Sequence, residues 1–317
     1  MGVLVLTPGM QSTVQDAGRP GHRALGVSRA GAADRTSFEL ANRLAGNDPG
    51  VAGLELAWSG PRLRFESPCV VALAGAEIEA HTEAGAVPMH RPVALGAGAT
   101  LELGAIRGGA RTYLAVAGGF DVPNVLGSAS TDLTACFGGI DGRPLRKGDV
   151  LRLCASPQPV ASQGPANWWI AAPPHLPRAG AADVRVLPGA HGIGLLERLC
   201  GTAWRVSADA SRMGLRLEGA SIEAAQATLT SEPVTIGTVQ LPPSGQPIVL
   251  GVDAQTVGGY PRIAHVIAAD WPVLGQLRPG DRLRFVTVDG ASARAALGEL
   301  SGYLARVGEA IRARRTG

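Results

Sequence analysis

Short segments rich in β-branched residues, each bounded by Gly or Pro, recur along nearly the whole chain. Segments of about four to eight residues with this composition are typical of β-strands. Their regular spacing, with a turn signal after each, favours a sandwich or a barrel. The 44 glycines and 23 prolines among 317 residues supply the tight turns of such a fold. The predicted strands are residues 3–6, 62–65, 70–74, 100–103, 113–117 and 150–153, and then 184–187, 203–206, 215–218, 247–252, 263–268 and 282–288.

Two sequence elements occur once in each half of the chain. Residues 145–153 read LRKGDVLRL and residues 277–285 read LRPGDRLRF, a turn followed by an alternating strand. Residues 5–9 read VLTPG, and residues 186–189 read VLPG. Because the second pair marks the starts of two halves and the first pair marks their ends, the repetition favours two related β-domains. Chance similarity in a chain of restricted composition is the alternative.

These repeats also suggest domain limits. At about 100–200 residues per domain, a chain of 317 residues allows two domains. We predict a mainly β protein with a first domain at residues 1–160 and a second at residues 183–317. The linker between them, residues 161–182, is rich in Pro, Ala and Gln, and its Trp168 and Trp169 are expected to pack onto a domain.

A few helices complete the predicted fold. Asp34 can cap a helix that ends at Ala45, and Gly46 supplies its C-terminal stop. A shorter helix is predicted for residues 193–200. A C-terminal helix, residues 291–314, has apolar residues at steps of three and four along one face, namely Leu297, Leu300, Leu304, Val307 and Ile311.

Charge and lysine content exclude two classes of function. The formal net charge is +3, and no basic cluster with interleaved aromatic residues occurs, so nucleic acid is not an expected partner. Lys147 is the single lysine and lies in an Arg-Lys-Gly-Asp sequence. A phosphate-binding P-loop needs a Gly-Lys-Ser or Gly-Lys-Thr ending, so the chain is not a P-loop ATPase.

Metal, disulfide and membrane signals are missing from the sequence. The four cysteines have no CxxC spacing and the six histidines form no HxH or HExxH pattern, so we expect neither disulfides nor a metal site. No apolar run reaches the roughly 18 residues of a membrane helix. The first residues lack the positive start of a signal peptide. We therefore expect a cytoplasmic protein that does not enter a membrane.

The densest group of polar residues lies in the second half. Residues 240–247 read QLPPSGQP, a strand follows, and residues 253–262 read DAQTVGGYPR. A strand that ends in a loop with carboxylate, amide, hydroxyl, phenol and guanidinium groups is how ligand sites are commonly built. The two glycines let backbone N–H groups approach a ligand closely. A pair of ordinary β-turns is the alternative.

Two stretches in the first half are further candidates. In residues 12–21, Asp16 and Arg19 can pair with each other or face a ligand, and a structural turn explains them equally well. In residues 128–132, hydroxyl groups next to Asp132 can bind an anion or cap a turn.

Several motifs, in order along the chain, resemble one family. They are TVQDAGRPG at 13–21, AN at 41–42 with GN at 46–47, LE at 54–55, YLAVAGG at 113–119, LGSASTD at 126–132, SRMGLRL at 211–217, PPSGQP at 242–247 and DAQTVGGYPR at 253–262. On these motifs the chain resembles the KipA-like family, which includes the C subunit of prokaryotic 5-oxoprolinase and relatives of biotin-dependent carboxyltransferases. Residues 28–34, SRAGAAD, depart from the family's usual Pro-x-Ser-Gly-Ala-x-Asp sequence.

The resemblance implies two cyclophilin-like β-barrel domains and work within a hetero-oligomer. The implied partners are a KipI-like protein as the B subunit, together with a LamB/YcsF-like protein as the A subunit. The implied activity is ATP-dependent conversion of 5-oxo-L-proline to L-glutamate, with Mg²⁺ as a further candidate at the level of the complex. The chain is also similar to the carboxyltransferase part of urea carboxylase. It has no Met-Lys-Met sequence that accepts biotin, so it is not expected to carry covalent biotin.

The candidate residues have expected roles in such chemistry. Asp253 and Tyr260 are the candidate catalytic residues, which would handle protons. The guanidinium of Arg262 suits a carboxylate such as that of 5-oxoproline. The candidate substrate-binding residues are Gln255, Thr256, Arg262, Ser244, Gln246, Arg212 and Asp132, with Gln15, Asp16 and Arg19 as additional candidates.

Three functions are open at this point. The first is a subunit of an ATP-hydrolysing 5-oxoprolinase. The second is the carboxyltransferase subunit of a urea carboxylase or allophanate-type biotin system. The third is a non-enzymatic regulator that binds a KipI-like kinase inhibitor.

Overall fold

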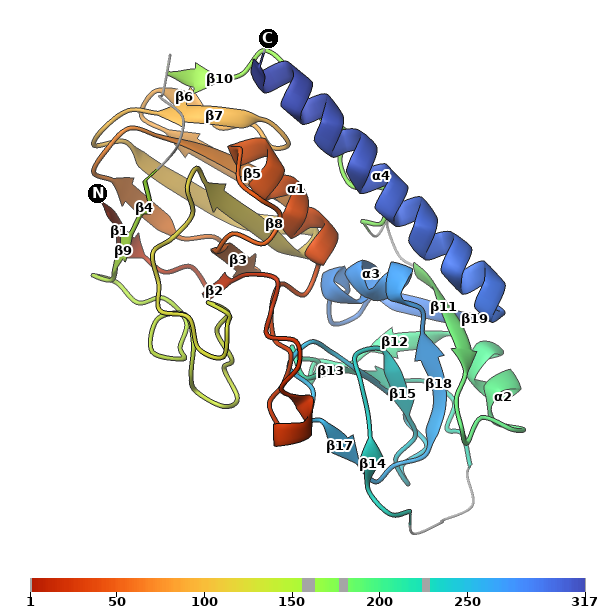
Figure 1. Cartoon of the computed structure of the whole chain (residues 1–317). Helices are drawn as coiled ribbons and strands as arrows, with labels where there is room; N and C mark the ends of the chain where they lie inside the picture. The colour runs from red at the N-terminus through yellow and green to blue at the C-terminus, as the bar shows by residue number, and fades with distance from the viewer. Residues whose placement is uncertain (1, 156–162, 177–181, 224–228, 317) are drawn as a thin grey trace. The chain divides into compact units, whose positions relative to one another are not determined.

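The computed structural model describes residues 2–155, 163–176, 182–223 and 229–316 (Figure 1). Contacts within the chain divide it into two compact units. The first unit comprises Met1–Arg19, Ala30–Leu176 and Tyr303–Gly317, and the second comprises Pro20–Arg29 and Pro177–Gly302. The units are interleaved in sequence, whereas the repeats predicted contiguous domains at 1–160 and 183–317. The predicted border at residue 160 lies outside the described residues.

A ten-stranded antiparallel sheet forms the body of the first unit. Its strands follow the order β10-β7-β5-β8-β4-β1-β9, while β3 also pairs with β8, β2 with β3, and β6 with β5. Alternate side chains of these strands share one face and build a single apolar core that includes Val3, Leu63, Leu73 and Leu114. The strands are β1 (Gly2–Thr7), β2 (Gln11–Gln15), β3 (Gly53–Ala57), β4 (Arg62–Phe65), β5 (Cys69–Thr82), β6 (Gly85–Ala86), β7 (Pro92–Leu95), β8 (Thr100–Val116), β9 (Val150–Arg152) and β10 (Gly164–Pro165).

Helix α1 (Arg35–Ala45) covers β5 and β8 of this sheet (Figure 1). Asp34 caps it, since Oδ1 of Asp34 accepts the N–H of Ser37 at 3.0 Å. The buried face of α1 forms a second apolar cluster with the end of α4 (Gly290–Thr316). The predicted capped helix and the predicted C-terminal helix are therefore both confirmed, and the latter packs through Leu304, Val307 and Ile311.

Gly46 ends α1 with a left-handed φ of +87° and leaves room for the guanidinium of Arg315. A Cβ at Gly46 would lie 1.9 Å from Nη2 of Arg315, whose Nη1 donates to the carbonyl of Leu44 at 2.8 Å. We expect Gly46→Ala to destabilise the protein by about 2–3 kcal/mol, because left-handed backbone costs a non-glycine residue about 1 kcal/mol and the arginine must also move.

Urea denaturation measures this loss, with Gly127→Ala as the matched control. Gly127 has a similar φ of +77°, but its Cβ position has no described atom within 4 Å. The control should therefore show the backbone cost without the displaced arginine. Equal losses in the two variants would contradict the proposed contact with Arg315.

A closed seven-stranded barrel forms the body of the second unit, in the order β11-β18-β15-β16-β13-β12-β19. This confirms the predicted mainly β fold and the barrel in the second half. A separate two-stranded sheet joins β14 (Glu232–Pro233) to β17 (Val257–Gly258). The barrel strands are β11 (Ala182–Pro188), β12 (Trp204–Val206), β13 (Gly214–Glu218), β15 (Thr238–Gln240), β16 (Ile248–Leu250), β18 (Arg262–Val266) and β19 (Arg282–Thr287). Short helices of the same unit are η1 (Arg23–Leu25), α2 (Leu196–Cys200), η2 (Ala268–Asp270) and α3 (Trp271–Gln276).

The repeated Leu-Arg-x-Gly-Asp sequence folds in the same way in both units. Asp149 accepts the backbone N–H three residues earlier through Oδ2 at 2.7 Å, and Asp281 does the same at 2.8 Å. Gly148 and Gly280 both have a φ of +91°. In each turn the glycine N–H donates to a carbonyl of a neighbouring strand at 2.8 Å. The repeat is therefore a turn that delivers β9 and β19 to their sheets.

Several elements differ from the predicted ones. The predicted strands at 100–103 and 113–117 are one strand, β8, because β5 pairs along the Gly-rich stretch between them with two register shifts. Helix α2 begins at Leu196 because Gly194 has a φ of +73°. The described part of the predicted linker, residues 163–176, belongs to the first unit and packs there through Trp168. Among the described residues, no helix is long and apolar enough to cross a membrane.

Candidate functional site

Arg212 and Asp253 form a buried ion pair in the second unit. Nε of Arg212 donates to Oδ2 of Asp253 at 2.7 Å and Nη2 donates to Oδ1 at 3.0 Å. The two side chains are only 6% and 1% exposed. Antiparallel pairing of β13 with β16 brings their loops together, and the N–H of Asp253 also donates to the carbonyl of Arg212 at 3.1 Å. The pair therefore fixes the start of the loop that follows β16.

This loop exposes Gln255 and Tyr260 and buries Thr256. Arg23 joins the loop to Val234, the residue after β14, since its Nη2 donates to the carbonyl of Val234 and, at 3.3 Å, to that of Gln255. Burial lowers the pKa of Arg23. The N–H of Val234 donates in turn to the carbonyl of Thr256 at 3.0 Å. The loop is thus held at its start by an ion pair and in its middle by a guanidinium.

Arg262 begins β18, and β14 engages its guanidinium. Nη2 pairs with the carboxylate of Glu232, and Nη1 donates to the carbonyl of Pro233 at 3.3 Å. The backbone N–H of Arg262 donates to Nδ1 of His191 at 3.2 Å. The guanidinium expected to bind a ligand carboxylate therefore already holds a carboxylate of this chain.

Ser244 and Gln246 lie in the turn between β15 and β16 and bind other parts of the turn region. The amide of Gln246 accepts the N–H of Gly219 at 2.9 Å and donates to the carbonyl of the same residue at 3.1 Å. The hydroxyl of Ser244 accepts the N–H of Gln246 at 3.4 Å, and its carbonyl accepts the hydroxyl of Ser221 at 3.2 Å. These contacts stabilise the turn.

Gln240, at the end of β15, is a residue that the sequence did not single out. It is 1% exposed, and its Nε2 has no hydrogen-bond partner among the described residues. A signal was present, since Gln240 is the first residue of the polar stretch at 240–247. Only the barrel shows that this amide is buried. We take the loop after β16, together with β14 and Gln240, as the candidate site.

In the first unit, the carboxylate of Asp16 collects four hydrogen bonds. Oδ1 accepts the N–H of Gly18 at 2.7 Å, the hydroxyl of Ser128 at 2.6 Å and the hydroxyl of Ser130. Oδ2 accepts the N–H of Ala129 at 2.7 Å. These contacts join the end of β2 to the loop at 128–130, as a structural turn requires.

The neighbouring candidates are also bound within the first unit. The amide of Gln15 donates to the carbonyl of Thr131 at 3.1 Å, while its Oε1 has no partner among the described residues. The guanidinium of Arg19 is fully buried and lies 4.6 Å from the ring centroid of Phe137. Oδ1 of Asp132 accepts two N–H groups of the following turn, at 3.0 and 2.9 Å.

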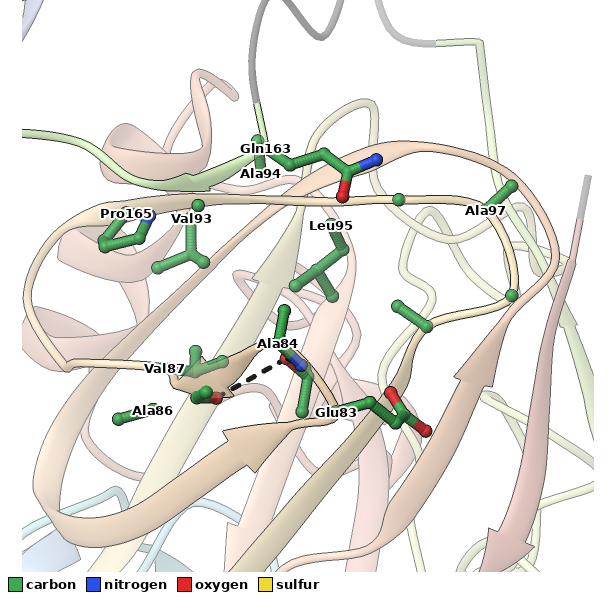
Figure 2. Close-up of a pocket in the computed structure, with 16 residues that line it drawn as sticks. Glu83, Ala84, Ala86, Val87, Val93, Ala94, Leu95, Ala97, Gln163 and Pro165 are labelled. Atoms are coloured by element: carbon green, nitrogen blue, oxygen red, sulfur yellow. Dashed lines mark hydrogen bonds between the residues drawn. The ribbon is translucent and has the colours of Figure 1, made fainter.

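A cavity of about 460 Å³ lies elsewhere in the first unit, between the β5–β6 turn, β7 and β10 (Figure 2). Its lining is largely apolar and includes Val87, Val93 and Leu95, and Glu83 is the ionisable residue among the described residues that line it. The N–H of Thr100 donates to Oε2 of Glu83 at 3.0 Å, and this bond lowers the pKa of Glu83. None of the predicted site residues lines this cavity, so it does not contain the polar chemistry described above.

Comparisons with known proteins identify the family. A family model described as the carboxyltransferase domain, subdomain A and B, matches residues 25–287. The chain is 38% identical over 289 residues to the 5-oxoprolinase C subunit of Escherichia coli K12, covering 89% of this chain and 90% of that protein. It is 35% identical to the 5-oxoprolinase C subunit of Haemophilus influenzae, covering 88% of each.

A solved structure agrees with these relatives. The crystal structure of the K. lactis urea amidolyase matches with a TM-score of 0.87 and 30% identity over 96% of this chain, which spans 20% of that protein. The comparisons confirm the resemblance drawn from the motifs. The chain belongs to the family of carboxyltransferase domains, subdomains A and B.

Proposed function

We propose that this chain is the C subunit of an ATP-dependent 5-oxoprolinase, which converts 5-oxo-L-proline to L-glutamate. The observation that carries the proposal is the 38% identity to the E. coli C subunit across 90% of that protein. Similarity over nearly the full length of both chains supports the same role in the same kind of assembly. By contrast, the chain corresponds to only 20% of the urea amidolyase that it matches.

The proposal includes two partners and a nucleotide. A KipI-like protein as the B subunit, together with a LamB/YcsF-like protein as the A subunit, completes the enzyme, and ATP, with Mg²⁺, is bound at the level of the complex. Lys147 is exposed in the turn before β9 of the first unit, and it lies in no phosphate-binding motif. We therefore assign no residue of this chain to the phosphates. Opening a lactam requires activation of an inert carbonyl, which ATP can supply.

Within this proposal the candidate residues divide into two tasks. A carboxylate held by a guanidinium is a weaker base than a free one, so we assign the Arg212–Asp253 pair mainly to positioning the loop. The phenol of Tyr260, 45% exposed at the far end of the loop, is the proton-handling group. The amide of Gln255 and the hydroxyl of Thr256 bind the substrate beside it.

Glutamate release from 5-oxo-L-proline and ATP tests the proposed function. The full complex of the three subunits is expected to be active, whereas this chain alone and each pair of subunits are not. Tyr260→Phe should lower kcat by about 10²-fold or more with little change in KM, if the phenol transfers a proton. A matched control is Tyr303→Phe, since Tyr303 lies on α4 and packs against the apolar cluster of the first unit.

Two other outcomes would redirect the assignment. A folded three-subunit complex without turnover, in which this chain supports transfer from carboxybiotin to urea, would favour a biotin-dependent carboxyltransferase. Binding to the KipI-like partner without either activity would favour the regulator. Near-normal turnover in Tyr260→Phe would remove Tyr260 from the chemistry while leaving the function in place.

A further inference from the structure

Two buried N–H donors lie unused in the second unit. Nε2 of Gln240 and Nε of Arg262 are both inaccessible to solvent and have no hydrogen-bond partner among the described residues. Leaving a buried donor unpaired is costly, so most buried polar groups in folded proteins are hydrogen-bonded. An unpaired donor that belongs to no apolar cluster therefore needs an explanation, and a bound acceptor is the simplest one.

The barrel places the two donors side by side. Gln240 of β15 is the direct partner of Arg262 of β18. A register shift just before this pair leaves Ile263 of β18 without a partner in β15. Directly opposed residues of an antiparallel pair share one face, with Cβ atoms about 4.5–5.5 Å apart. Ile263 is fully buried in the barrel core. The bulge thus turns the amide and the guanidinium toward the same outer face of the barrel.

Strands β14 and β17 cover this face. A Cβ at Gly258 of β17 would lie 2.4 Å from Nε2 of Gln240, so the backbone passes directly over the amide. Gly258 pairs with Glu232 of β14, and the carboxylate of Glu232 binds Nη2 of Arg262. The side chain of Glu232 is 45% exposed. It can therefore exchange the arginine for water without disturbing the barrel.

The charges around this face favour an anion once Glu232 has left. Through their guanidiniums, Arg262 binds β14 and Arg23 binds Val234, the residue after β14. Arg212 of the same unit is neutralised by Asp253. Burial, and then the charge of Arg262, lower the pKa of His265 on the same strand, so His265 adds no positive charge near neutral pH. The carboxylate of Glu232 is what balances Arg262 in the structure.

We propose that Gln240 and Arg262 form a binding site for the carboxylate of a small ligand, and that Glu232 occupies this site when the ligand is absent. The ligand carboxylate replaces Glu232 on the guanidinium and accepts the N–H of Gln240. Identifying the ligand as 5-oxo-L-proline rests on the proposed function, but a carboxylate site at this position does not.

Calorimetric titration of the full chain tests the site directly. The probes are 5-oxo-L-proline, bicarbonate, and 2-pyrrolidone, which has the lactam ring without the carboxylate. We expect 5-oxo-L-proline to bind and 2-pyrrolidone not to bind. Binding of bicarbonate with the same residue dependence, and not of 5-oxo-L-proline, would keep the carboxylate site and reject 5-oxo-L-proline as its ligand.

Two variants should shift the affinity in opposite directions. Gln240→Leu is expected to weaken binding about tenfold to a hundredfold, the effect of one hydrogen bond to a charged group. Glu232→Gln is expected to tighten binding about threefold to tenfold, because the competing carboxylate is removed. Glu218→Gln is the matched control, since Glu218 pairs with Arg205 at 2.7 Å elsewhere on the second unit. It should leave the affinity unchanged.

Other results would overturn the site. No carboxylate binding by the wild-type chain, unchanged binding in Gln240→Leu, or weaker binding in Glu232→Gln would each do so. If Gln240→Leu only raises thermal stability and leaves carboxylate binding unchanged, the amide is an unpaired buried group and not part of a ligand site. Carboxylate binding that depends on Gln240, in a complex without 5-oxoprolinase activity, would reject the proposed function and keep the site. Turnover and carboxylate binding that are both unchanged in Gln240→Leu would reject the site and keep the proposed function.

Discussion

Arg212→Met is expected to destabilise the second unit by about 3–5 kcal/mol, because it leaves the Asp253 carboxylate buried without its guanidinium. Both side chains are almost fully buried, at 6% and 1% exposure, so water cannot take over the role of the lost partner. Urea denaturation of the purified chain measures the loss. Arg284→Met is the matched control, since Arg284 pairs with Asp183 on the surface at 62% and 55% exposure. Such exposed pairs contribute little to stability.

The double variant Arg212→Met/Asp253→Leu separates structure from chemistry. Replacing a whole buried ion pair by apolar side chains of similar size is often neutral or stabilising, so most of the lost stability should return. If the pair mainly positions the loop, turnover of the assembled complex should return with it, to within about tenfold of wild type. A double variant that folds normally but is inactive would make Asp253, Arg212 or both participants in the reaction, as the sequence first suggested.

Local signals in the sequence predicted those parts of the fold that depend on neighbouring residues. The cap at Asp34 and the stop at Gly46 lie at the two ends of one helix, and both were found. The two Leu-Arg-x-Gly-Asp turns were recognised from their repeated sequence, and in the structure each closes through a hydrogen bond between residues three apart. These features need no knowledge of which strands pair.

The candidate site could be predicted only in part, since its contacts join distant segments. Asp253 and Arg262 were expected to face a ligand, but their partners lie 41 and 30 residues away in sequence. The sequence could not show that the carboxylate of Glu232 pairs with the guanidinium of Arg262. It also could not show that Gln240 is buried, because that follows from the barrel closure and from the bulge at Ile263. The sequence showed which segments are rich in polar residues, while the contacts of each residue required the strand pairing.

Asp16→Asn is expected to destabilise the first unit by about 3 kcal/mol or more. Both carboxylate oxygens accept hydrogen bonds, three at Oδ1 and one at Oδ2. The amide nitrogen of asparagine is a donor. In either orientation of the side chain it therefore faces an N–H or O–H group that donated to the aspartate. The cost combines a lost charge-assisted bond of about 1.5–3 kcal/mol with a buried donor left unpaired at about 1–3 kcal/mol.

Thermal and urea unfolding of Asp16→Asn, compared with Asp141→Asn, measure this effect. Asp141 is in the same unit, its side chain is 85% exposed, and its φ of +52° suits asparagine, so the control should be nearly neutral. If the role of Asp16 is structural, turnover of the complex should fall in parallel with the folded fraction, and KM should stay unchanged. If Asp16 instead contacts the substrate, the variant would keep its stability and raise KM. That result would move the candidate site of this family member toward the loop at residues 128–132.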